Sequence, residues 1–188
     1  SPESILLGVS DLDHFKEHVV EPFGHIAAGN VIRQYVALSQ KMLGEDGVIG
    51  AYGGDEFTIL MWDGRINGLQ RMDSIRKSVE EHAFTVTLPV EKKHQIVRGE
   101  GIGLLKVIDG EDRIMLSEDT RIEETESNLV IGLPPGSITV TMGGASMSEE
   151  EDMGVDARRI YHGLLEKGIS RLNASKHRGN RNTINPGD

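Results

Sequence analysis

The chain has 188 residues, enough for one domain or for one domain with a sizeable insertion. Its 20 Lys and Arg against 30 Asp and Glu give a formal net charge of −10, which disfavours DNA, RNA or an anionic membrane surface as a partner. There is no cysteine, so disulfides, thiolate metal sites and cysteine nucleophiles are excluded. No apolar run approaches the ~20 residues that cross a bilayer, and we expect no membrane contact by this segment.

The first part of the chain alternates between strand and helix patterns. A continuous apolar run predicts a buried strand, apolar residues at helical spacing predict two helices, and a Gly-Gly turn between two apolar runs predicts a β-hairpin. In chain order the predicted elements are a strand at 4–10, a helix at 29–42, strands at 48–51 and 56–62, and a helix at 65–82.

The rest of the chain predicts a β-rich segment and then a return to the same pattern. Short alternating segments between residues 85 and 136, separated by Gly, Pro and charged turns, predict antiparallel strands. A β-branched strand at 138–145 and a helix at 156–176 follow. We therefore predict one α/β (α+β) domain over 1–188, with a ferredoxin-like βαββαβ core and an insertion of β-hairpins at about 85–137.

Acidic residues follow two strands that neighbour each other in such a core. Asp11 comes directly after the first strand, and Asp55 and Glu56 lie at the hairpin tip. Clustered carboxylates repel unless a cation lies between them, and Mg²⁺ (or Mn²⁺) binds one or two carboxylates together with substrate phosphates. Gly53 and Gly54 have no Cβ, which lets a nucleotide lie against the turn. The pattern predicts a metal-dependent nucleotide site with Asp11 and Asp55 as metal ligands.

Four motifs strengthen this prediction. The run YGGDEF at 52–57 resembles the complete signature of the GGDEF, or diguanylate cyclase, family. DLDHFK at 11–16 resembles the first-strand motif of that family, and TVTMGGA at 139–145 resembles a later core strand. Lys176 with Gly179 and Arg181-Asn182 resembles its closing motif. The resemblance covers residues 4–84 and 138–184 and implies a palm domain of the nucleotidyl cyclase type.

The resemblance also implies an activity and residue roles. Members of the family condense two GTP molecules into cyclic di-GMP with release of pyrophosphate, as a homodimer. It implies that the Leu12 carbonyl assists the metal carboxylates and that Glu56 orients or deprotonates the attacking 3′-hydroxyl. It implies a nucleotide-binding set that contacts phosphates and base, namely Gly53, Gly54, Asn30, His14, Phe15, Lys16, Lys176 and Arg181.

Base identity and activity stay open at this point. The resemblance places Asn30 where the family has an Asp that reads guanine, and an amide both donates and accepts hydrogen bonds. Two alternatives to a diguanylate cyclase therefore remain. One is an inactive nucleotide-binding sensor, and the other is a related palm cyclase that uses ATP or another nucleotide. In each case we expect a cytoplasmic domain, including as the cytosolic part of a longer sensor protein.

Overall fold

The computed structural model describes residues 5–100, 102–147 and 156–187, so Ser4 of the first predicted strand lies outside the described residues. The chain forms two compact units. The first comprises residues 1–13, 36–79 and 139–188, and the second comprises residues 14–35 and 80–138.

The first unit contains a five-stranded sheet with β1 (Leu6–Leu12) at its centre. β1 is antiparallel to β10 (Val140–Ser146) on one side and to β3 (Glu56–Met61) on the other. β2 (Gly47–Gly53) pairs with β3 at one edge, and the short β11 (Ile184–Asn185) pairs in parallel with β10 at the other. Every residue of β1 and β10 is buried, as expected for strands covered on both faces.

The order of elements confirms the predicted fold class. The chain runs β1, α1, β2, β3, α2, β10, and the spatial order β10-β1-β3-β2 is that of a ferredoxin-like sheet. The four predicted core strands begin and end within two residues of the observed ones, whereas β11 was not predicted. The β-rich segment lies between α2 and β10 in the sequence.

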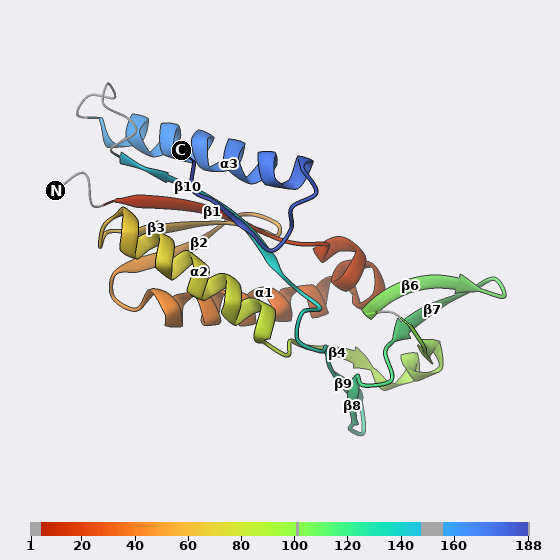
Figure 1. Ribbon diagram of the computed structural model, residues 1–188. Helices are drawn as coiled ribbons and strands as arrows, with labels where there is room; N and C mark the ends of the chain where they lie inside the picture. Colours follow the sequence, from red (N-terminus) through yellow and green to blue (C-terminus); the bar gives the residue numbers. More distant parts are fainter. Residues whose placement is uncertain (1–4, 101, 148–155, 188) are drawn as a thin grey trace. The chain divides into compact units, whose positions relative to one another are not determined.

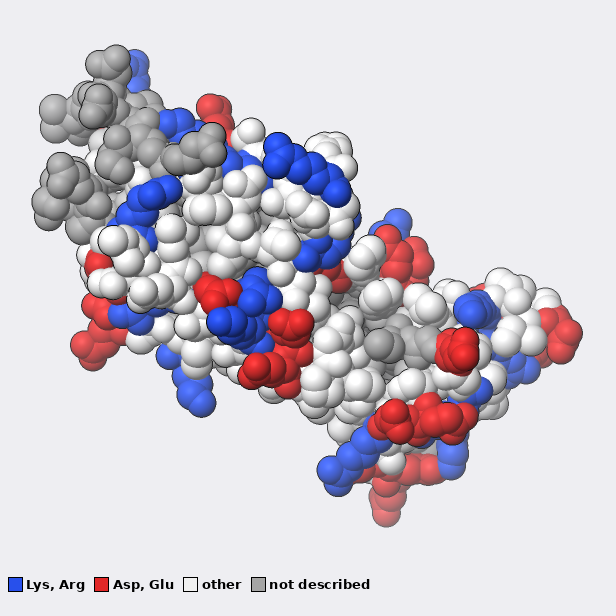
Figure 2. Space-filling model, in the orientation of Figure 1, with Lys and Arg blue, Asp and Glu red and all other residues white. Residues whose placement is uncertain are grey.

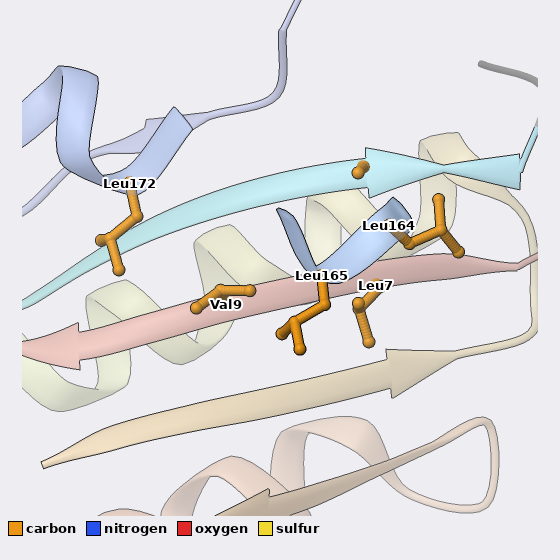
Figure 3. Close-up of a cluster of buried hydrophobic side chains, with 6 residues drawn as sticks. Leu7, Val9, Leu164, Leu165 and Leu172 are labelled. Carbon is orange, nitrogen blue, oxygen red and sulfur yellow. The ribbon is translucent and has the colours of Figure 1, made fainter. Parts of the chain in front are cut away.

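The sheet of the first unit is covered by α3 (Ala157–His177) on one face and by α2 (Arg65–Glu81) on the other (Figure 1). Asp156 caps α3 by accepting a hydrogen bond from the backbone N–H of Arg158. The apolar stripe of α3 packs on β1 and β10 in a cluster formed by Leu7, Val9, Ala145, Leu164, Leu165 and Leu172 (Figure 3). This packing places the C-terminal turn of α3, which carries Lys176, over the end of β1.

Helix α1 (Glu21–Leu43) begins earlier than the helix predicted at 29–42. It is interrupted at Gly24, where φ is 83°. Phe23, Ala27, Ala28 and Val31 are all buried at helical spacing, so burial of this face outweighs the low helix propensity of the Gly-Asn pair that follows Ala28. None of the helices formed by the described residues is long and apolar enough to cross a bilayer.

The second unit holds the β-rich segment, which forms two three-stranded sheets. The first sheet has the order β4-β9-β8 and the second the order β5-β7-β6. Alternate residues of β4 and β9, among them Val86, Leu88, Leu129 and Ile131, are buried in the core of this unit. The bounds are β4 Thr85–Pro89, β5 Ile96–Arg98, β6 Ile102–Ile108, β7 Glu111–Leu116, β8 Arg121–Glu124 and β9 Asn128–Gly132, with a short 3-10 helix at Val90–Gln95.

The prediction that all these strands are antiparallel was wrong for one pair. β5 and β7 are parallel, whereas β6 and β7 form an antiparallel hairpin. The reason is topological: β6 turns back from β5, and β7 then returns between them in the direction of β5. The order and direction of strands within a sheet depend on which strands pair with each other. The alternation of apolar residues along each strand does not encode this pairing.

Candidate active site

The structure brings the predicted metal carboxylates together at one end of β1. Asp11 lies opposite Glu56 in the antiparallel register of β1 and β3. The backbone N–H of Leu12 donates a hydrogen bond to the carbonyl oxygen of Asp55, 3.3 Å away. Gly54 has a φ of 52°, a backbone conformation that glycine adopts without strain, and it completes the tight turn before Asp55. The turn between β2 and β3 therefore lies directly beside the end of β1.

Asp11 is a buried carboxylate that forms an ion pair with a lysine. Its exposed fraction is 8%, and its Oδ1 forms an ion pair with the ammonium of Lys176. Burial raises the pKa of the Asp11 carboxyl, the hydrogen bond and charge of Lys176 oppose this, and the charges of Asp55 and Glu56 raise the pKa further. The net direction is upward. The Lys176 ammonium thus does not fully compensate the burial of Asp11 and its repulsion from Asp55 and Glu56, and further positive charge beside Asp11 would stabilise its ionised form.

The donor set at this edge suits a magnesium ion that is shared with a ligand. Among the described residues no group of three or more Asp, Glu or His side chains is arranged as a metal cage. Mg²⁺ does not need one, because it is commonly bound by one or two carboxylates plus substrate phosphates. Lys176 already shows that a cation fits on Asp11. Asp11, Asp55 and the Leu12 carbonyl are the groups that could hold the metal.

Gly53 and Gly54 leave the backbone of the turn accessible. A Cβ at Gly54 would have no heavy atom within 4 Å, and a Cβ at Gly53 would meet only the Glu56 carboxylate at 3.9 Å. Crowding by the protein therefore does not explain why residues 53 and 54 are glycines. Open space over two glycines beside the carboxylates is what a ligand lying on the backbone requires.

A second carboxylate, Asp13, is buried at the same end of the sheet and was not among the predicted site residues. Its exposed fraction is 2%. It accepts hydrogen bonds from the hydroxyls of Thr139 and Thr141, each at 2.8 Å, and from the backbone N–H of Asn182 at 2.9 Å. The guanidinium of Arg181 lies 3.9 Å from its Oδ1. The sequence signal was its position two residues after Asp11, on the same strand end.

The remaining predicted nucleotide contacts belong to the second unit. His14 is exposed and has a φ of 54°, whereas the Phe15 side chain is buried. The Lys16 side chain is 77% exposed and its ammonium lies 3.9 Å from a Glu21 carboxylate oxygen. Asn30 accepts a hydrogen bond from the Arg33 guanidinium. It also lines a cavity of about 420 Å³ together with Phe23, Gly24, His25, Ile26, Thr87, Leu88, Pro89, Lys92 and Asn128.

Comparison with known proteins assigns the chain to a family. The fold is that of a palm-like cyclase domain. The family model described as "Diguanylate cyclase, GGDEF domain" matches residues 1–113, more than half of the chain. The chain belongs to the GGDEF domain family. The match includes Asp11 and the 52–57 signature and runs into the β-rich segment, whereas Lys176 and Arg181 lie beyond it.

Individual relatives agree with this assignment. The chain is 28% identical over 116 residues to the probable diguanylate cyclase DgcF of Escherichia coli K12, and 32% identical over 81 residues to diguanylate cyclase DgcP of Pseudomonas aeruginosa. These matches cover 58% and 43% of this chain but 36% and 12% of the two relatives, so the chain corresponds to only a part of each.

Solved structures show the same fold. The GGDEF domain of DgcB from Caulobacter crescentus, solved with c-di-GMP, aligns with a TM-score of 0.55 at 21% identity over 96% of this chain and 76% of that one. The active GGEEF domain of a diguanylate cyclase from Vibrio cholerae aligns with a TM-score of 0.53 at 16% identity, over 98% and 85% of the two chains. At such identities the likeness establishes the fold.

Proposed function

We propose that this domain is a diguanylate cyclase, which condenses two GTP molecules into cyclic di-GMP with release of two pyrophosphates. The observation that carries the proposal is the buried Asp11 carboxylate beside Asp55 and Glu56, in a chain of the GGDEF family. Asp11, Asp55 and the Leu12 carbonyl are the groups we assign to a Mg²⁺ or Mn²⁺ ion. When bound, the ion polarises the α-phosphate and favours deprotonation of the ribose hydroxyl.

In each of the two condensation steps the 3′-oxygen of one nucleotide attacks the α-phosphorus of the other. The bond between that phosphorus and the bridging oxygen breaks, and pyrophosphate leaves in line with the attack. We assign Glu56 to hold the 3′-hydroxyl and to accept its proton. This carboxylate belongs to the first residue of β3, opposite Asp11 and next to Asp55, and it is not among the groups that we assign to the metal. Lys176 and Arg181 would bind the outer phosphates, Lys176 as a compact charge and Arg181 through its planar fork.

The proposed reaction requires two copies of the domain. One site holds one triphosphate whereas the product joins two nucleotides, so two sites must face each other in a homodimer. GTP is a cytoplasmic metabolite, and we accordingly place the domain in the cytoplasm. Nucleic-acid polymers remain poor partners: among the described residues on the face in Figure 2, basic and acidic side chains occur in small interspersed groups instead of one extended basic surface.

The test is incubation of the purified protein with Mg²⁺ or Mn²⁺ and each of the four nucleoside triphosphates in turn, with products identified by mass. Cyclic di-GMP from GTP supports the proposal. A cyclic or linear product from another nucleotide would instead identify a related palm cyclase, and binding without turnover would identify a sensor. Asp55→Asn should abolish turnover because it removes a metal carboxylate, and unchanged activity of this variant would refute the metal assignment.

A further inference from the structure

Asp13 joins three parts of the first unit that are far apart in the sequence. It follows β1, its hydroxyl partners Thr139 and Thr141 lie at the start of β10, and its amide partner Asn182 lies after α3. The backbone N–H of Asp13 also donates to the carbonyl of Thr139, 2.9 Å away. A carboxylate has room for several hydrogen bonds, and here both oxygens are used within the protein.

These contacts make Asp13 unsuited to a metal and suited to fixing a loop. Its carboxylate is almost fully buried and already accepts two hydroxyl hydrogen bonds and one amide hydrogen bond. Charge-assisted hydrogen bonds of this kind are strong and geometrically restrictive. Asn182 has a φ of 53°, a left-handed backbone conformation that is uncommon for residues other than glycine. The hydrogen bond from its backbone N–H to the Asp13 carboxylate helps to stabilise this conformation.

The residue that this loop presents is Arg181. Asn182 is its immediate neighbour, so the amide hydrogen bond fixes the backbone next to it. The Arg181 guanidinium lies 3.9 Å from Asp13 Oδ1, and 37% of its side chain is exposed. A guanidinium has five N–H donors, so the side facing solvent keeps donors for a ligand. Asp13 thus restrains both the backbone and the charged end of one arginine.

We infer that Asp13 is a positioning residue that orients Arg181 toward the outer phosphates of the bound nucleotide. This inference rests on the proposed function, because it takes a nucleoside triphosphate as the ligand of the first unit. Pre-orientation lowers the cost of ordering a long side chain when the ligand binds. Asp13 acts through Arg181, because both oxygens of its buried carboxylate are already engaged within the protein.

The experiment measures dissociation constants for a nucleoside triphosphate with a non-hydrolysable α,β-methylene bridge and for the matching monophosphate, using the base that the wild type accepts. Asp13→Asn should weaken triphosphate binding by about tenfold, roughly the loss of one well-aligned charged contact. Monophosphate binding should change by less than about twofold, because it lacks the outer phosphates that Arg181 contacts. A purely structural role would weaken both ligands alike.

A double-mutant cycle with Arg181→Met tests whether Asp13 acts through that arginine. If it does, Asp13→Asn adds little further loss in the Arg181→Met background. Thr141→Val is the matched control, since it removes a hydrogen bond from the same carboxylate without touching Arg181, and should leave triphosphate binding nearly unchanged. If Asp13→Asn does not fold by circular dichroism, Asp13→Glu replaces it, because it keeps the charge but moves it by one methylene.

The outcomes separate this inference from the proposed function. A full additional loss in the Arg181→Met background, an equal loss for both ligands, or unchanged binding by the Asp13 variant would overturn the positioning role. Failure of the wild-type protein to bind any triphosphate would instead overturn the proposed function.

Discussion

Replacing Gly143 with alanine should destabilise the first unit, because α3 lies against the backbone of β10 at this point. A Cβ at Gly143 would lie 2.1 Å from the carbonyl oxygen of Gly168 and 2.6 Å from the backbone nitrogen of Leu172. Both neighbours are backbone atoms of α3, so relief requires the helix to move. The adjacent Gly144 faces α2, and a Cβ there would meet the flexible Met72 side chain at 3.5 Å.

The expected magnitudes follow from this difference. Overpacking a well-packed core costs about 1–3 kcal/mol, and backbone atoms cannot rotate away, so Gly143→Ala should fall at the upper end or above. For a chain of this size each kcal/mol lowers Tm by about 2–4 °C, so a cost of about 3 kcal/mol gives a decrease of about 6–12 °C, and a larger cost gives a larger decrease. Gly144→Ala should change the free energy of unfolding by less than about 1 kcal/mol, and it can be stabilising through the lower entropy of the unfolded chain.

The assay is urea and thermal denaturation of both variants beside the wild type, followed by far-UV circular dichroism. Because Lys176 lies in the last turn of α3, displacement of the helix should also reduce the proposed cyclase activity in Gly143→Ala more than in Gly144→Ala. Equal denaturation midpoints for the two variants would refute the claim that the approach of α3 to β10 requires a glycine at residue 143.

Three further predictions concern α3 and the carboxylate it faces. Lys176→Met removes the ammonium that competes for Asp11, so Mn²⁺ affinity without nucleotide should rise by about tenfold in titration calorimetry. The exposed Lys41→Met is its charge-matched control, and equal affinities would contradict the prediction. Burial is the main cause of the raised pKa of Asp11, and the nearby carboxylates raise it further. Ionisation of this group is therefore less favourable in the folded chain than in the unfolded chain. Wild-type stability should therefore fall relative to Asp11→Asn as pH rises from 3.8 through the raised pKa, as urea denaturation at a series of pH values would show; no change in the difference would contradict this. Asp156→Ala removes the cap of α3 and should cost about 0.5–2 kcal/mol of unfolding free energy, whereas an unchanged denaturation midpoint would exclude a stabilising cap.

The sequence by itself determined the local elements and the end of the sheet at which the acidic residues gather. The buried run that became β1, the Gly-Gly turn before Asp55 and the helical stripe of α3 are patterns among near neighbours in the chain. The proximity of Asp11 and Asp55 is not local, because it depends on the pairing of β1 with β3, and it could be predicted only because the expected βαββ order makes these two strands neighbours. The metal and nucleotide roles of these residues stay predictions.

Only the tertiary structure decided which distant groups meet at that end. The Lys176 ammonium on Asp11 and the Asn182 amide on Asp13 join residues more than 160 positions apart, and the parallel pairing of β5 with β7 depends on a third strand. Such contacts arise from the close packing of α3 on β10 and from the order in which strands meet. Local propensity encodes neither the packing of α3 on β10 nor the order of the strands. The free energy that stabilises both comes from burial shared among segments that are separated in the chain.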